Sequence, residues 1–398
     1  MKLSVAANYD PDLIPKLTGF PVGEVYGKLP SDPVGGGRPS YMATPLSEQD
    51  LAAYVAELGR HGIAFNYLLN SSCQGNREWG RRWQRRLLRL LENLGTMGVR
   101  RLTVSTPYLL ERVKAAFPQF QVKAGIYAQI DTPRRARFWQ DLGADALTLE
   151  SFSINRDFPV LRAIREAVDC ELQLIANHPC LPNCPMQPYH QNGFAHSSDG
   201  SRSLFIDYCF LSCTLKRLED PSALIKAAWI RPEDIAFYEA MGYQHFKLLE
   251  RGIPSAELLR RVEAYSQRKS GENLAELILP YGFRQAPKKQ RFWLLRHFFR
   301  PGQINPWRLR PLHALLREQG MLFALEQSPF RIDTRKIPPD FVNGFEHRGC
   351  SRLSCGQCRY CEQIAAETVT IEPAFREGQR NQLKEAKQGL IDGRVWCA

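Results

Sequence analysis

The strongest constraint on the fold is an alternation of short β-forming runs with helical patterns along the first 251 residues. Strands that alternate with helices build parallel sheets. Eight such strands predict a closed (β/α)8 TIM-like barrel of the α/β class, because open doubly wound sheets more often carry fewer strands. The predicted strands are Lys2–Asn8, Glu24–Leu29, Ala64–Ser71, Arg101–Thr106, Gln121–Ala128, Ala146–Glu150, Glu171–Asn177 and His245–Arg251.

The length of 398 residues exceeds the ~250 that such a barrel takes, which leaves room for an extension. We expect a barrel over residues 1–270, a basic aromatic extension over 271–345 and a cysteine-rich C-terminal segment with a helical tail over 346–398. The connection between the seventh and eighth strands, 178–242, is abnormally long. Because long insertions concentrate on the C-terminal face of a barrel, we expect a functional site there.

The charge balance predicts an anionic partner. The formal net charge is +12, and Tyr281–Arg317 holds nine Lys or Arg residues, no acid and several interleaved aromatic residues. Cations for phosphate and rings for unstacked bases suit RNA. The alternatives are a membrane surface, a docking partner, or an outer helix that packs its rings on the barrel. No apolar stretch is long enough to cross a membrane and no signal peptide is evident, so we expect a cytoplasmic protein without a transmembrane segment.

Eleven cysteines are many for a cytoplasmic protein, where disulfides are disfavoured and metal ligation is the default interpretation. The first group has the spacing Cys180-x3-Cys184-x24-Cys209-x3-Cys213. Two close pairs brought together by a loop supply four thiolates to one tetrahedral zinc ion or to a [4Fe–4S] cluster. The spacing alone leaves both metals open.

The second group is Cys350-x4-Cys355-x2-Cys358-x2-Cys361. Three cysteines at x2 spacing are similar to the bacterial ferredoxin run, in which successive thiolates bind corners of one cube. The pattern predicts a second cluster, and the alternative is a small structural zinc site that fixes the C-terminal tail.

The segment Trp229–Tyr265 resembles a signature of the peptidase U32 family of collagenase-like proteins, and the stretch from Glu171 to Cys184 resembles the family's strand that leads into a cysteine-bearing loop. The resemblance covers about Lys2 to Arg268. The matching positions are Glu233-Asp234, Gly242, Phe246-Lys247 and Glu250-Arg251.

The resemblance implies a [4Fe–4S] cluster on Cys180, Cys184, Cys209 and Cys213, and it therefore favours iron over zinc. It also implies an oxygen-independent hydroxylation, or a related anaerobic redox modification, of an aromatic or nucleobase substrate. Some members carry the older label of peptidase, which is the alternative activity. The arginine-asparagine-arginine-glycine motif of the RNA-modifying branch does not precede a cysteine here, so the substrate stays open.

Four residues near the predicted barrel mouth are candidates for catalysis. His178 flanks the first cysteines and suits proton donation or a hydrogen bond to sulfur. Lys247, Glu250 and Arg251 end the eighth strand, where Lys247 and Arg251 suit a carboxylate-bearing donor. A structural ion pair is the competing interpretation for the last three. An electron donor or a paralogous subunit is the expected partner of a redox enzyme. A non-catalytic RNA-binding or scaffold protein with structural metal sites is the remaining alternative.

Overall fold

The predicted barrel is confirmed. The structure is a computed structural model that describes residues 1–37, 43, 45–199, 205–249, 253–278, 302, 307, 330–346, 348, 350 and 355–396. Eight parallel strands pair in sequence order and close when β1 pairs with β8. The strands are β1 (Lys2–Ala6), β2 (Val22–Gly27), β3 (Ala64–Leu69), β4 (Arg101–Val104), β5 (Gln121–Ala124), β6 (Ala146–Thr148), β7 (Glu171–Ile175) and β8 (His245–Leu248).

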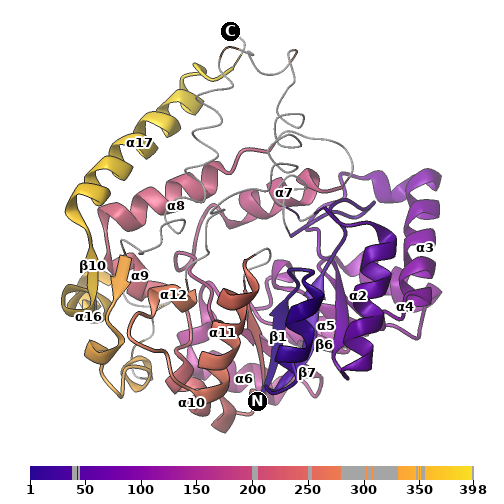
Figure 1. Cartoon of the computed structure of the whole chain (residues 1–398), viewed down its shortest axis with the longest axis horizontal. Helices are drawn as coiled ribbons and strands as arrows, with labels where there is room; N and C mark the ends of the chain where they lie inside the picture. The colour runs from indigo at the N-terminus through magenta and orange to yellow at the C-terminus, as the bar shows by residue number, and fades with distance from the viewer. Residues whose placement is uncertain are drawn as a thin grey trace.

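An outer layer of helices covers the strands (Figure 1). Local sequence signals set their ends: Ser47 forms a capping box with Asp50, and the Thr132 side chain accepts a hydrogen bond from the Arg135 amide. The helices of this layer are α1 (Ile14–Leu17), α2 (Glu48–Arg60), α3 (Arg81–Thr96), α4 (Pro107–Ala116), α5 (Pro133–Asp141), α6 (Phe158–Ala167), α10 (Ile235–Ala240) and α11 (Ser255–Gln267).

The long connection between β7 and β8 forms an insertion of three further helices, α7 (Gln187–Ser197), α8 (Tyr208–Glu219) and α9 (Ser222–Lys226). Beyond α11 the structure describes α12 (Ala275–Ile278), β9 (Phe330–Ile332), α15 (Cys355–Cys358), α16 (Tyr360–Thr368), β10 (Val369–Ile371) and α17 (Pro373–Ile391). β9 and β10 pair antiparallel. Helix α17 packs along α8, and α16 packs against α9 (Figure 1).

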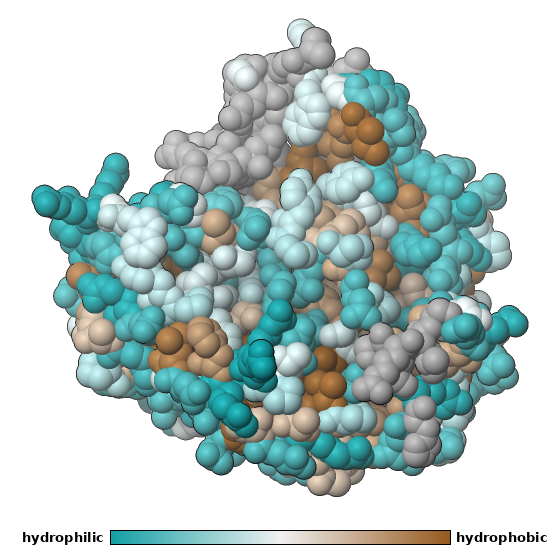
Figure 2. All heavy atoms as spheres, turned by 180° about the vertical axis from the view of Figure 1, so that it is seen from behind, coloured by the Kyte–Doolittle hydropathy of each residue, from teal (hydrophilic) through white to brown (hydrophobic). Residues whose placement is uncertain are grey.

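The basic segment Tyr281–Arg317 lies outside the described residues except for Gly302 and Trp307, so its predicted contact with an anionic partner stays a prediction. The surface seen in Figure 2 is mainly hydrophilic, with hydrophobic residues gathered in separate patches. Within the described part of the chain, no helix has the length and apolar character that crossing a membrane requires.

The interior of the barrel contains a buried ion network. The Glu24 carboxylate on β2 lies 3.2 Å from the Lys123 amine on β5 and accepts hydrogen bonds from Ser4 at 2.6 Å and Asn66 at 3.1 Å. Burial opposes ionisation of Glu24, but the charge of Lys123 and these hydrogen bonds outweigh it and hold the pKa of the carboxyl at about 2. The closed strands therefore surround a charged pair that is almost entirely buried.

We expect Glu24→Gln to lower the free energy of unfolding by about 3–5 kcal/mol at pH 7, because it removes the carboxylate nearest to the buried Lys123 ammonium. The pKa of Glu24 is lower in the folded than in the unfolded chain, so its contribution is complete above pH 4.5 and is lost as the pH falls towards 2. Urea unfolding followed by circular dichroism at pH 7 and at pH 3 measures both effects.

Glu111→Gln, which changes an exposed carboxylate on α4, serves as the matched control and should leave the unfolding midpoint unchanged. An equal effect of both substitutions, or a Glu24→Gln effect that does not shrink at low pH, would contradict the buried ion network.

Candidate functional site

The first cysteine group lies beyond the C-terminal end of the barrel strands. Cys180 and Cys184 occupy the loop that follows β7, while Cys209 and Cys213 lie one turn apart on α8. The negative charge that Cys184 or Cys213 would carry as a thiolate raises the pKa of the other members of the group. These interactions place the four thiols in one region of the insertion, where no three of the described side chains are arranged to hold a single metal ion.

Desolvation favours the protonated form of three of these thiols. Burial is the largest cause of the raised pKa of Cys180, of Cys213, and of Cys209, whose pKa reaches about 12. Asp207, which caps α8, raises the pKa of Cys209 further. Ionisation of these three thiols at neutral pH therefore requires a cation bound between them.

Arg217 is a functional candidate that the sequence reasoning missed. It follows Cys213 by one turn of α8, and its buried guanidinium donates to the Cys213 sulfur at 3.2 Å and to the Pro179 carbonyl at 2.6 Å. Its charge lowers the pKa of Cys180 and of Cys213 against the effect of burial. The four-residue spacing of Cys213 and Arg217 predicts that they share one face of a helix, but helical spacing alone does not show that the arginine is buried.

The predicted catalytic residue His178 packs edge-on against Phe152, with ring centroids 4.6 Å apart, and its Nδ1 lies 2.5 Å from the Ser151 hydroxyl. Burial and the nearby Arg217 charge lower the pKa of His178 to about 3. The imidazole is therefore neutral at physiological pH, which suits a hydrogen-bonding role better than proton donation.

Lys247, the second predicted catalytic residue, is buried inside the barrel rather than exposed at its mouth. Its amine lies 3.9 Å from the centroid of the Tyr26 ring, and its charge helps to lower the pKa of Glu24. This position agrees with the structural interpretation of Lys247. Glu250 and Arg251 lie outside the described residues, so their predicted role stays a prediction.

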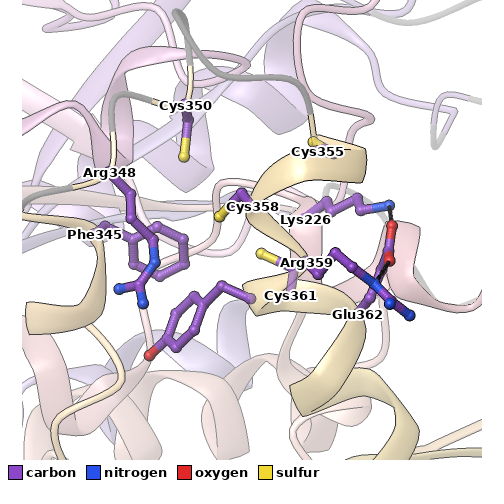
Figure 3. Close-up of a pocket in the computed structure, with 10 residues that line it drawn as sticks. Lys226, Phe345, Arg348, Cys350, Cys355, Cys358, Arg359, Cys361 and Glu362 are labelled. Carbon is purple, nitrogen blue, oxygen red and sulfur yellow. Dashed lines mark hydrogen bonds and ion pairs between the residues drawn. The ribbon is translucent and has the colours of Figure 1, made fainter.

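The second cysteine group lines a single pocket. Cys350, Cys355, Cys358 and Cys361 share it with Phe345, Tyr360 and charged side chains (Figure 3). Within the described part of the chain, no three His, Cys, Asp or Glu side chains are arranged to hold a single metal ion.

Further candidates lie where the loop after β3 meets α7. The Ser72 hydroxyl donates to the Asn192 side chain at 2.8 Å, which ties the loop to the helix. Amide atoms of Asn70, Gln74 and Gln191 are buried here without a hydrogen-bond partner among the described residues. Unsatisfied buried amides are costly, so a bound polar group is a natural complement to them.

No family model matches the chain. Among solved structures, the chain is similar to a U32 peptidase at 20% identity, with a TM-score of 0.49 over 64% of this chain and 94% of the other. A structure of D-psicose 3-epimerase matches at 13% identity, with a TM-score of 0.33 over 50% of this chain and 82% of the other.

Among curated proteins, the chain is similar to an uncharacterized protease of Methanocaldococcus jannaschii. The two are 30% identical over 350 residues, which cover 88% of this chain and 89% of the relative. The protein belongs to the peptidase U32 family.

Proposed function

We propose that the protein is an iron–sulfur enzyme that carries out an oxygen-independent hydroxylation, or a related redox modification, of an aromatic or nucleobase substrate at the mouth of its barrel. The grouping of Cys180, Cys184, Cys209 and Cys213 carries this proposal. The family resemblance favours a [4Fe–4S] cluster there. Such a cluster supplies one-electron redox chemistry when bound.

The donor set fits a cluster because of its chemistry. Four thiols are the usual ligands of a [4Fe–4S] cube, and the sulfur of Cys213 already accepts a hydrogen bond from Arg217. Hydrogen bonds to ligand sulfur and a nearby positive charge both stabilise a thiolate. Arg217 would therefore hold Cys213 in the orientation and charge state that iron requires.

The surrounding residues supply the other parts of a binding site. The neutral imidazole of His178 lies two residues before Cys180 and can donate or accept a hydrogen bond. The buried amides of Asn70, Gln74 and Gln191 offer both donors and acceptors to a flat, polar ring. We expect these amides to orient the substrate rather than to take part in the reaction.

A peptidase is the second candidate, and one contact favours it. The Ser151 hydroxyl and His178 Nδ1 are 2.5 Å apart, which is the arrangement of a nucleophile and its base, and the relative from Methanocaldococcus jannaschii is called a protease. However, Ser151 is buried and the pKa of His178 is about 3, so this imidazole is a weak base. The pair therefore supports hydrolysis less well than the cysteines support a redox reaction.

We expect oxygen-free protein to contain iron and acid-labile sulfide, and Cys180→Ser to lose about four irons per chain, because each cube holds four. Iron and sulfide analysis with electron paramagnetic resonance spectroscopy measures this loss. Cys170→Ser is the matched control, since Cys170 lies just before the opposite end of β7 and should keep the full iron content.

Stoichiometric zinc without sulfide at the first group would refute the proposal. Peptide hydrolysis that survives Cys180→Ser and disappears in Ser151→Ala would establish the peptidase instead.

We expect Arg217→Met to weaken iron retention, because it removes a hydrogen bond between charged groups that contributes about 1.5–3 kcal/mol. Arg217→Lys should restore part of the effect, since it keeps the charge but loses the fork of donors. Iron remaining after anaerobic gel filtration is the measurement. Lys216→Met, at the neighbouring exposed position of α8, is the control, and equal iron loss in that variant would exclude a specific role for Arg217.

A further inference from the structure

The four cysteines of the second group line one pocket at the contact between α9 and α16. The sulfur atoms of Cys350, Cys358 and Cys361 point into this hollow (Figure 3). A single zinc ion, with Zn–S bonds of about 2.3 Å, would draw the four sulfur atoms closely around itself. The described cysteines are not arranged around a single metal ion, so the wider spacing of ligands on an inorganic cube fits them better.

The charges around the pocket are mainly positive, which suits an anionic cluster with four thiolate ligands. Lys226, Arg348 and Arg359 line the pocket, and Glu362 is the acidic residue among its lining side chains. Glu362 forms an ion pair with Lys226 at 3.2 Å. The Arg348 guanidinium lies over the Tyr360 ring, 4.2 Å from its centroid.

Arg156 adds a buried charge from the barrel. It follows β6, and its guanidinium lies 4.4 Å from the Trp229 ring centroid and 4.7 Å from that of Phe345. It donates to the Ile225 carbonyl at 2.6 Å and the Trp229 carbonyl at 3.1 Å. These contacts fix the cation in one place at the contact between the barrel and the C-terminal segment.

Arg156 lies directly behind one wall of the pocket. Its guanidinium packs on the Phe345 ring, and that ring lines the pocket together with the four cysteines. A buried cation in this position favours negative charge in the pocket.

We propose that Cys350, Cys355, Cys358 and Cys361 hold a second [4Fe–4S] cluster, and that Arg156 is a positioning residue whose charge stabilises it from the barrel side. The cluster joins Cys350 to α15 and α16, and so fixes the segment that packs on the insertion. The proposal for this site does not depend on the reaction proposed for the first group at the barrel mouth.

The full-length chain with Cys180→Ser tests the site without interference from the first group. We expect about four irons and four sulfides per chain to remain after oxygen-free purification, and Cys358→Ser in the same background to remove them. Stoichiometric zinc without sulfide in the Cys180→Ser chain would overturn the proposal, as would iron that is unaffected by Cys358→Ser. Loss of every iron on Cys180→Ser alone would also overturn it. If only the first group fails to bind a cluster, four irons per chain should still be measured at the second group.

The role of Arg156 has a separate readout. Reduction adds a negative charge to the cluster, so removal of a nearby buried cation should shift its reduction potential to a lower value. We expect this shift in Arg156→Met, with Arg156→Lys intermediate, in redox titrations followed by electron paramagnetic resonance. Arg137→Met, which changes an exposed arginine on α5, should leave the potential unchanged.

Should Arg156→Met fail to fold, Arg156→Lys still tests the role, because it keeps the charge but moves it away from the stacked rings. An unchanged potential in either folded Arg156 variant would show that Arg156 has only a packing role.

Discussion

The packing of the β7–β8 insertion against the C-terminal segment is the contact on which both cysteine groups depend. Helix α8 presents Cys209 and Cys213, and α17 packs along it, with the Arg376 side chain donating to the Leu218 carbonyl at 2.6 Å. Helix α9 packs against α16, which carries Cys361. Burial of apolar residues supplies most of the stabilisation of such contacts. A change that detaches the C-terminal segment would therefore disturb both groups at once.

In both cysteine groups, a buried arginine lies near thiols that burial keeps protonated. Buried thiols stay protonated, and four thiolates cannot lie together without positive charge. Each group has a buried arginine, Arg217 or Arg156, that is fixed by backbone carbonyls and has no carboxylate in ion-pair contact among the described residues. A carboxylate partner would neutralise the cation, whereas a carbonyl holds it in place and leaves its charge to act on the sulfur atoms. Metal binding would supply the remaining charge and would contribute directly to folding.

The barrel could be predicted from the sequence because parallel strands buried on both faces appear as short, regularly spaced apolar runs. The predicted and observed strands all overlap, and the Ser47 and Thr132 caps mark helix starts that the sequence also indicates. The Glu24–Lys123 pair could not be predicted, since it joins strands whose neighbourhood only barrel closure defines. The same holds for Arg156, which approaches the second cysteine group from a distant part of the chain. Local spacing identifies the cysteines of each group, but long-range packing selects the charged residues that lie near them.

The contact between Ser151 and His178 illustrates why geometry alone does not establish a peptidase. A general base must be unprotonated and must have a pKa close to the pH at which the enzyme works. At His178, burial and the charge of Arg217 lower the pKa to about 3, because both disfavour the imidazolium that proton abstraction would create. The charge of Arg217, which favours thiolates on Cys180 and Cys213, is thus the same charge that weakens His178 as a base. Arg217 therefore acts against hydrolysis by Ser151 and His178 at this end of the barrel. Its contact with the Cys213 sulfur supports the proposed redox reaction instead.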